Sequence, residues 1–162
     1  YTWSRQGQRA LVKTCGQRKN LKVFGATEYF SGRLVYKTED DKLTSKTYLA
    51  FLKTLLQRFA GRIILIHDNA PYHKSSAICQ FLASEPRLEC CPLPSYSPDY
   101  NLIEYLWKKA KARVHNKYFP TFDTLKKCVH SALRYFQKNA SEILSLHGVY
   151  DREVIFAPSQ AA

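Results

Sequence analysis

One short apolar run, followed directly by a carboxylate, constrains the fold of this chain more than any other feature. The run covers residues 62–67, and Asp68 comes straight after it. A continuous apolar stretch of this length is typical of a strand that is buried on both faces of a parallel sheet. Because parallel strands need crossover helices, the run predicts an α/β domain with Asp68 at the carboxyl end of a buried strand. Ligands of such sheets bind beyond these strand ends.

The patterns on either side of this run supply the other elements of an α/β domain. Residues 21–29 and 33–37 predict two strands joined by a two-residue turn at Ser31-Gly32, which together form a β-hairpin. We expect one mixed sheet flanked by helices, in a single domain that spans residues 1–162. The remaining segments predict a strand over residues 88–93 and helices over residues 45–59, 75–82 and 102–116, after Thr121 and around Ile143.

The charge of the chain predicts a polyanionic partner. Its 162 residues carry a net charge of +12, and the pI is about 9.6. Nucleic acid is the first candidate, whereas a solvated basic surface, or contact with a ribosome or membrane surface, is the alternative. No apolar run approaches the ~18–20 residues of a membrane span. We therefore expect a cytoplasmic protein, associated with the nucleoid if the host is a prokaryote.

The cysteines and histidines do not have the pattern of a zinc site. The five cysteines are odd in number and include no CxxC spacing, which indicates reduced thiols in a cytosolic protein. His67 and His73 bracket one short segment, but they lack the spacing of zinc ligands. We expect both rings to be hydrogen-bonded scaffold, with His73 supporting the edge on which Asp68 lies.

A second carboxylate, Glu104, opens a predicted helix, and 35 residues separate it from Asp68. Two carboxylates at a strand end and a helix start can hold Mg²⁺ or Mn²⁺, since these cations prefer hard oxygen ligands. Asn69 and Asn101 supply supporting polar groups. Other interpretations stay open, because Asp68 can also serve as a turn residue. Glu104 can equally form a capping box with Asn101 or pair with Lys108.

The helix that begins at Glu104 continues as a basic stripe. Cations one or two turns from a metal site are well placed to hold the phosphates of a nucleic acid. The alternative is an ordinary solvated helix face. Trp107, on the same helix, is expected in the core. The stripe consists of Lys108, Lys109, Lys111, Arg113 and Lys117.

These residues together resemble the catalytic domain of the DDE transposases, closest to the mariner-like group and its bacterial insertion-sequence relatives. The resemblance rests on residues 67–73, on residues 97–107, and on shorter likenesses at residues 1–8, 24–26 and 31–32. It implies a ribonuclease H-like fold and two-metal chemistry with Mg²⁺ or Mn²⁺. It also implies DNA cleavage at transposon ends and strand transfer into target DNA. Asp68 and Glu104 match the second and third catalytic acids of the family, both of them metal ligands.

The chain departs from the family pattern at its front. No residue of the chain matches the first catalytic Asp, which the family carries on the first, central strand, and no helix-turn-helix DNA-binding region is present. We therefore expect a sheet that lacks this strand, weak metal binding, and no efficient cleavage by this chain alone. Unpaired strand edges favour a homodimer or a domain-swapped oligomer. A catalytically inactive remnant that binds DNA or oligomerises, and a structure-specific nuclease of the same fold, are the alternatives.

Overall fold

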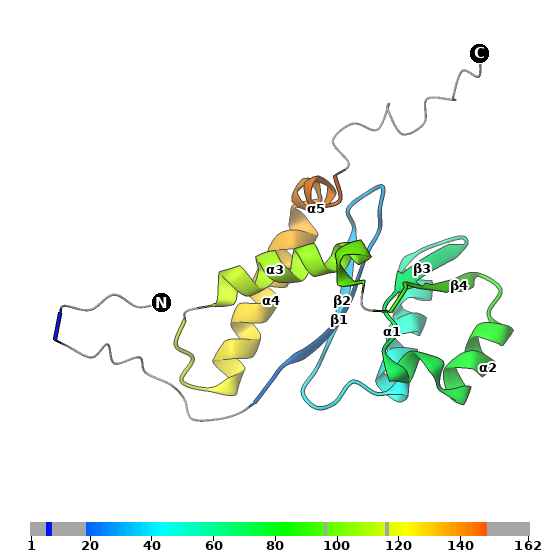
Figure 1. Cartoon of the computed structure of the whole chain (residues 1–162), viewed down its shortest axis with the longest axis horizontal. Helices are drawn as coiled ribbons and strands as arrows, with labels where there is room; N and C mark the ends of the chain where they lie inside the picture. Colours follow the sequence, from blue (N-terminus) through cyan, green and yellow to red (C-terminus); the bar gives the residue numbers. More distant parts are fainter. Residues whose placement is uncertain (1–5, 8–18, 96, 116, 149–162) are drawn as a thin grey trace, which may run out of the picture.

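The computed structural model describes residues 6–7, 19–95, 97–115 and 117–148, so the likeness noted at residues 1–8 lies almost wholly outside the described residues. Helices and strands follow one another in the order that the sequence predicts, as Figure 1 shows. The strands are β1 (Lys22–Thr27), β2 (Leu34–Glu39), β3 (Ile63–His67) and β4 (Leu88–Pro92). The helices are α1 (Ser45–Arg58), α2 (Ser76–Ser84), α3 (Leu102–Val114), α4 (Phe122–Lys138) and α5 (Ala140–Leu146), with short 3₁₀ turns η1 (Pro71–Lys74) and η2 (Pro98–Tyr100).

The strands form two separate sheets of two strands each, instead of the single mixed sheet expected from the sequence. β1 and β2 pair antiparallel, from Lys22 opposite Glu39 to Thr27 opposite Leu34. β3 and β4 pair in parallel. Within the described residues no strand bridges β1 and β3.

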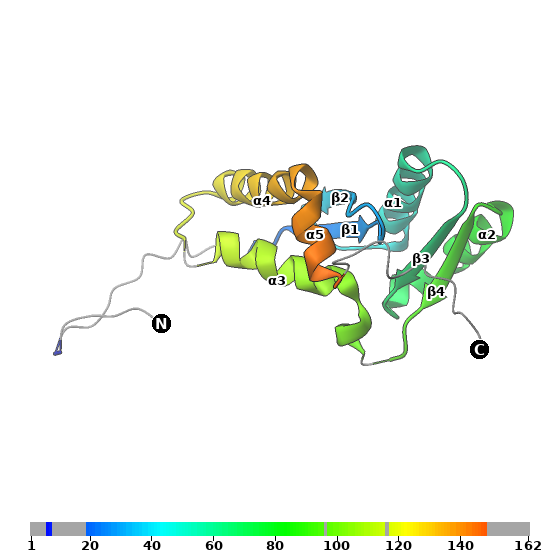
Figure 2. The same ribbon diagram turned by 90° about the horizontal axis from the view of Figure 1, so that it is seen from above.

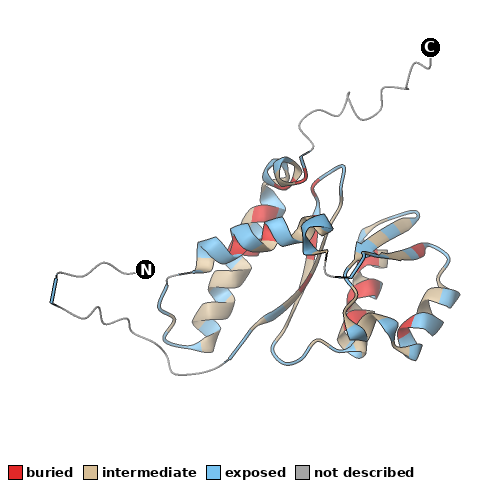
Figure 3. Ribbon diagram, viewed as in Figure 1, coloured by how far each residue is buried: buried red, intermediate tan, exposed pale blue. Residues whose placement is uncertain are grey.

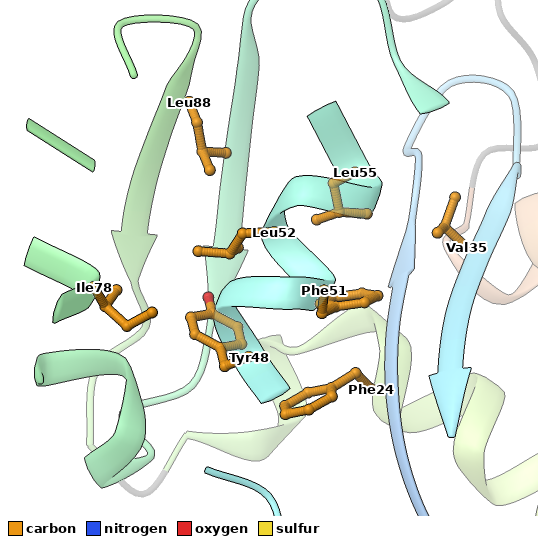
Figure 4. Close-up of a cluster of buried hydrophobic side chains, with 8 residues drawn as sticks. All are labelled: Phe24, Val35, Tyr48, Phe51, Leu52, Leu55, Ile78 and Leu88. Carbon is orange, nitrogen blue, oxygen red and sulfur yellow. The ribbon is translucent and has the colours of Figure 1, made fainter. Parts of the chain in front are cut away.

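Helix α1 joins the two sheets through one apolar cluster. Thr44 caps its first turn in a reciprocal capping box with Thr47, which satisfies backbone groups that would otherwise lack partners. One face of the helix then meets both sheets, and Phe51 stacks on Phe24 of β1 with ring centroids 5.4 Å apart. Figure 4 shows the buried members of the cluster, which are Phe24, Val35, Tyr48, Phe51, Leu52, Leu55, Ile78 and Leu88.

Helices α3, α4 and α5 cover the opposite face of the β1–β2 hairpin, and α5 crosses between α3 and α4 (Figure 2). Trp107 of α3 packs against this second cluster, as the sequence predicts. Its indole lies directly over Gly25, where a Cβ atom would stand 2.5 Å from Cη2 of the ring. The buried members are Leu34, Leu106, Ala110, Leu133, Phe136 and Ile143.

Two local expectations are wrong. β3 is not buried on both faces, because Ile64 and Ile66 are 60% and 59% exposed. Only the alternate residues Ile63 and Leu65 pack on the α1 cluster, and Figure 3 accordingly colours β3 as exposed and intermediate. The hairpin turn is also longer than two residues, since the bond from the N–H of residue 28 to the carbonyl of Arg33 encloses residues 29–32. In the part of the chain that the structure describes, no helix is long and apolar enough to cross a membrane.

Candidate functional site

Asp68 follows the last residue of β3 and begins a turn. Its Oδ1 accepts a hydrogen bond of 3.2 Å from the backbone N–H of Ala70, so the turn interpretation of this residue is confirmed. The side chain nevertheless remains 61% exposed. The turn therefore fixes the direction of the carboxylate while leaving it accessible to a ligand.

Glu104 lies in the first turn of α3 and is exposed. The capping-box interpretation is wrong, because the side chain of Asn101 makes no capping hydrogen bond. The backbone N–H of Asn101, which a capping box would direct to Glu104, donates instead to the carbonyl of Pro98 at 2.9 Å. A carboxylate in this position is favoured by the positive end of the helix dipole.

Asp68 and Glu104 line one pocket of about 200 Å³, together with Asn69 and Asn101. The structure thus brings together four site residues that the sequence predicts. The amide of Asn69 donates to the carbonyl of Leu93, which ties the end of β3 to the segment after β4. Sequence reasoning did not single out the rest of the lining as site residues, although Ser97 and Pro98 open the second motif. These residues are Leu93, Pro94, Ser95, Ser97 and Pro98.

His73 supports the turn but does not line this pocket. Its ring stacks on Tyr48 with centroids 4.3 Å apart, and its side chain is only 7% exposed. Its Nδ1 lies 2.6 Å from Nδ1 of His67 and 3.0 Å from the carbonyl oxygen of Asp68. Burial, and then the neighbouring His67, lower the pKa of His73 to about 4. The expectation of hydrogen-bonded histidines is confirmed.

A larger hollow of about 690 Å³ contains neither Asp68 nor Glu104. Lysines and aspartates line it together, and Lys126 pairs there with Asp40. Because its charges largely compensate one another, we place the candidate site at the smaller, oxygen-lined pocket.

Comparison with known families decides the identity. A family model described as DDE superfamily endonuclease matches residues 1–126. The chain belongs to this family. No curated protein matches the chain.

Solved structures support the fold of this DDE endonuclease. The Mos1 transposase in its paired-end complex with the left transposon end is 19% identical, at a TM-score of 0.60, over 93% of this chain and 51% of that chain. The catalytic core domain of BIV integrase is 17% identical, at a TM-score of 0.53, over 82% of this chain and 96% of that chain. The chain thus has the ribonuclease H-like fold of transposases and integrases, and it spans about half the length of the Mos1 chain.

The basic stripe of this DDE endonuclease divides into two kinds of residue. Lys108, Lys109 and Lys111 are exposed along α3. Arg113 is also exposed, but its guanidinium lies 3.5 Å from the ring centroid of Tyr135, where it joins α3 to α4 by a cation–π contact. Lys117 is exposed in the segment beyond the end of α3, because the helix stops at Val114, two residues before the predicted end.

Proposed function

We propose that this chain is the part of a DDE transposase that cuts DNA at transposon ends and joins it to target DNA. The observation that carries the proposal is that Asp68 and Glu104, with 35 residues between them, line one pocket. Membership of the endonuclease family supports it. The Mos1 transposase, of similar fold, forms a paired-end complex and a strand transfer complex.

Asp68 and Glu104 fit a hard divalent cation, Mg²⁺ or Mn²⁺. The polar side-chain atoms of the pocket lining are all oxygens, apart from the amide nitrogens of Asn69 and Asn101. Both carboxylates are exposed. Such a donor set is the one that these cations prefer. When bound, paired cations of this kind activate an attacking oxygen and stabilise the leaving oxygen in phosphodiester chemistry. Asn69 orients the rim by its bond to Leu93.

The DNA partner follows from charge and placement. The chain has a net charge of +12, and Lys108 and Lys111 lie one and two turns beyond Glu104 on the same helix. Lysines so placed can hold the phosphates that flank a cleaved bond. We assign the phosphate contacts to Lys108, Lys109, Lys111 and Lys117, and a mainly structural role to Arg113. A DNA substrate also implies a cytoplasmic, nucleoid-associated location in a prokaryote.

The family resemblance implies one more carboxylate, the first catalytic Asp, and no residue of this chain matches it. Asp68 and Glu104 alone should bind the cations weakly, so we propose that the 162-residue chain by itself does not cleave DNA efficiently. The alternative function is that of an inactive remnant that binds DNA or oligomerises.

The test of the proposed function is a nicking assay on transposon-end DNA with Mg²⁺ or Mn²⁺. It uses the chain together with the acid-bearing strand that the resemblance implies. Asp68→Asn and Glu104→Gln should each abolish nicking, whereas Asp99→Asn, which alters an acidic residue near Glu104 outside the pocket lining, should retain it. Activity in either of the first two variants would exclude them as metal ligands. Specific DNA binding without nicking would favour the remnant.

We also propose that the free strand edges drive association. β1 is paired only with β2, and β3 only with β4, among the described residues. Unpaired backbone groups on the free edge of either sheet can accept a strand from a second copy of the chain. Light scattering during size-exclusion chromatography should find a dimer or larger species. A stable, monodisperse monomer would count against this association.

A further inference from the structure

The imidazole rings of His67 and His73 converge on the backbone of Asp68. Nδ1 of His67 lies 2.6 Å from the Asp68 carbonyl oxygen, and Nδ1 of His73 lies 3.0 Å from it. The two Nδ1 atoms are themselves 2.6 Å apart. The carboxylate of Asp68 is close as well, with Oδ1 3.7 Å from Nδ1 of His73. One potential ligand atom from each of the three residues thus lies within 4.8 Å of the other two.

Hydrogen bonds cannot account for all the contacts among the two Nδ1 atoms and the Asp68 carbonyl oxygen. A neutral imidazole has one N–H and one lone pair, and a carbonyl oxygen can only accept. If both Nδ1 atoms carried hydrogens, the two N–H groups would oppose each other across 2.6 Å. At most one Nδ1 is therefore protonated, and the other directs a lone pair into the cluster. A cation in place of the shared proton would use both lone pairs and the oxygens together.

We propose that His67, His73 and Asp68 bind Zn²⁺ or a similar borderline transition-metal ion. Imidazole nitrogens suit such ions, whereas Mg²⁺ prefers oxygen ligands. Zn–N bonds are about 2.0–2.1 Å long, so two nitrogens on one tetrahedral zinc lie about 3.3 Å apart. The observed 2.6 Å must therefore open by roughly 0.7 Å. The pocket shared by Asp68 and Glu104 has no imidazole in its lining and suits the hard cations instead.

The packing of the two rings allows this small opening. His73 is fixed, because it stacks on Tyr48 at an interplanar angle of 16° and its side chain is 7% exposed. His67 is only partly buried at the end of β3, so it is the ring that adjusts. Asp68 is 61% exposed, which leaves room for water to complete the coordination.

The zinc site does not depend on the proposed transposase function, because its test involves neither DNA nor cleavage. Isothermal titration of the 162-residue chain with Zn²⁺, in excess Mg²⁺, should find one zinc ion per chain. His67→Gln and His73→Asn should each weaken the binding by at least about tenfold. Glu104→Gln, in the neighbouring pocket, and His115→Asn, at an exposed histidine elsewhere, should leave it unchanged.

Two further measurements control for misfolding and for other ligands. Circular dichroism checks that each variant is folded. If His73→Asn is unfolded, the test rests on zinc binding by His67→Gln, because His67 is partly exposed. Co²⁺ in place of Zn²⁺ reveals thiolate ligands by a charge-transfer band, which should be absent. Zinc binding that survives His67→Gln, that requires Cys90 instead, or that is lost with Glu104→Gln would overturn the proposal. The two rings would then only close the turn between residues 68 and 73.

Discussion

A single methyl group added at Gly25 tests how α3, and with it Glu104, is held on the hairpin. A Cβ atom there would lie 2.5 and 2.6 Å from two ring carbons of Trp107 and 3.1 Å from Cδ1 of Ile103. Carbon atoms in favourable contact are about 3.5–4.0 Å apart, so Gly25→Ala overlaps the indole by roughly 1 Å. The ring cannot yield easily, because it packs on the cluster around Leu106.

The expected size of the effect follows from two opposing contributions. Overpacking of this kind costs about 1–3 kcal/mol, whereas Gly→Ala stabilises by about 0.4–1 kcal/mol through the unfolded chain. The net loss is therefore at most about 2.6 kcal/mol, and it approaches zero where the smallest overpacking cost meets the largest gain. For a chain of this size the melting temperature should fall by up to roughly 10 °C, which thermal unfolding followed by circular dichroism can measure.

A double-mutant cycle isolates the contact from other effects. Trp107→Leu removes the ring carbons that the new methyl group would meet. In that background Gly25→Ala should leave the free energy of unfolding unchanged or raise it slightly, whereas in the natural chain it should lower it. The same loss of stability in both backgrounds would refute the argument that the indole requires a glycine at position 25.

The remaining predictions concern charge, protonation and capping. Lys108→Ala with Lys111→Ala should weaken DNA binding for all sequences and reduce the slope of log K against log salt by about 2, as measured by fluorescence anisotropy; an unchanged slope would make the stripe an ordinary solvated face. The pKa of His73 is lowered to about 4 from about 6.5 in the unfolded chain. The unfolded chain therefore takes up a proton first, and stability should fall by up to roughly 3 kcal/mol as the pH drops from about 6.5 to about 4. Urea unfolding across this window should give a flatter profile for His73→Asn, and an identical profile would contradict the assignment. Thr121→Ala should cost about 1 kcal/mol in chemical denaturation by removing the capping box of α4, whereas Thr121→Ser should cost much less.

Local elements could be predicted from the sequence because their signals are local. Thr44 and Thr121 begin their helices in the structure as their capping chemistry predicts. Asp68 and Glu104 could be placed at the same pocket because each lies where a strand ends or a helix begins, and the family motifs relate the two. The stacking of Arg113 on Tyr135 could not be predicted, since it depends on how α3 crosses α4.

The burial of β3 could not be predicted, because an apolar pattern shows that a strand can be buried. It does not show which helices or strands cover its two faces. Ile64 and Ile66 have the side chains of a fully covered strand, yet both are exposed. The convergence of His67 and His73 escaped prediction for a different reason. Their spacing of six residues matches no regular element, and the turn at residues 68–70 followed by η1 brings the rings back together.

The two carboxylates of the site belong to different halves of the molecule. Asp68 extends from the β3–β4 sheet, which packs on the α1 cluster, whereas Glu104 extends from α3, which packs on the far face of the β1–β2 hairpin. Among the described residues no strand hydrogen-bonds the two sheets to each other, so their relative position rests on α1 and on the segment between β4 and α3. We propose that a strand supplied between β1 and β3 would pair with the edges of both sheets and so fix the separation of the two carboxylates. Under this proposal, completing the sheet and orienting Asp68 against Glu104 would be the same structural event.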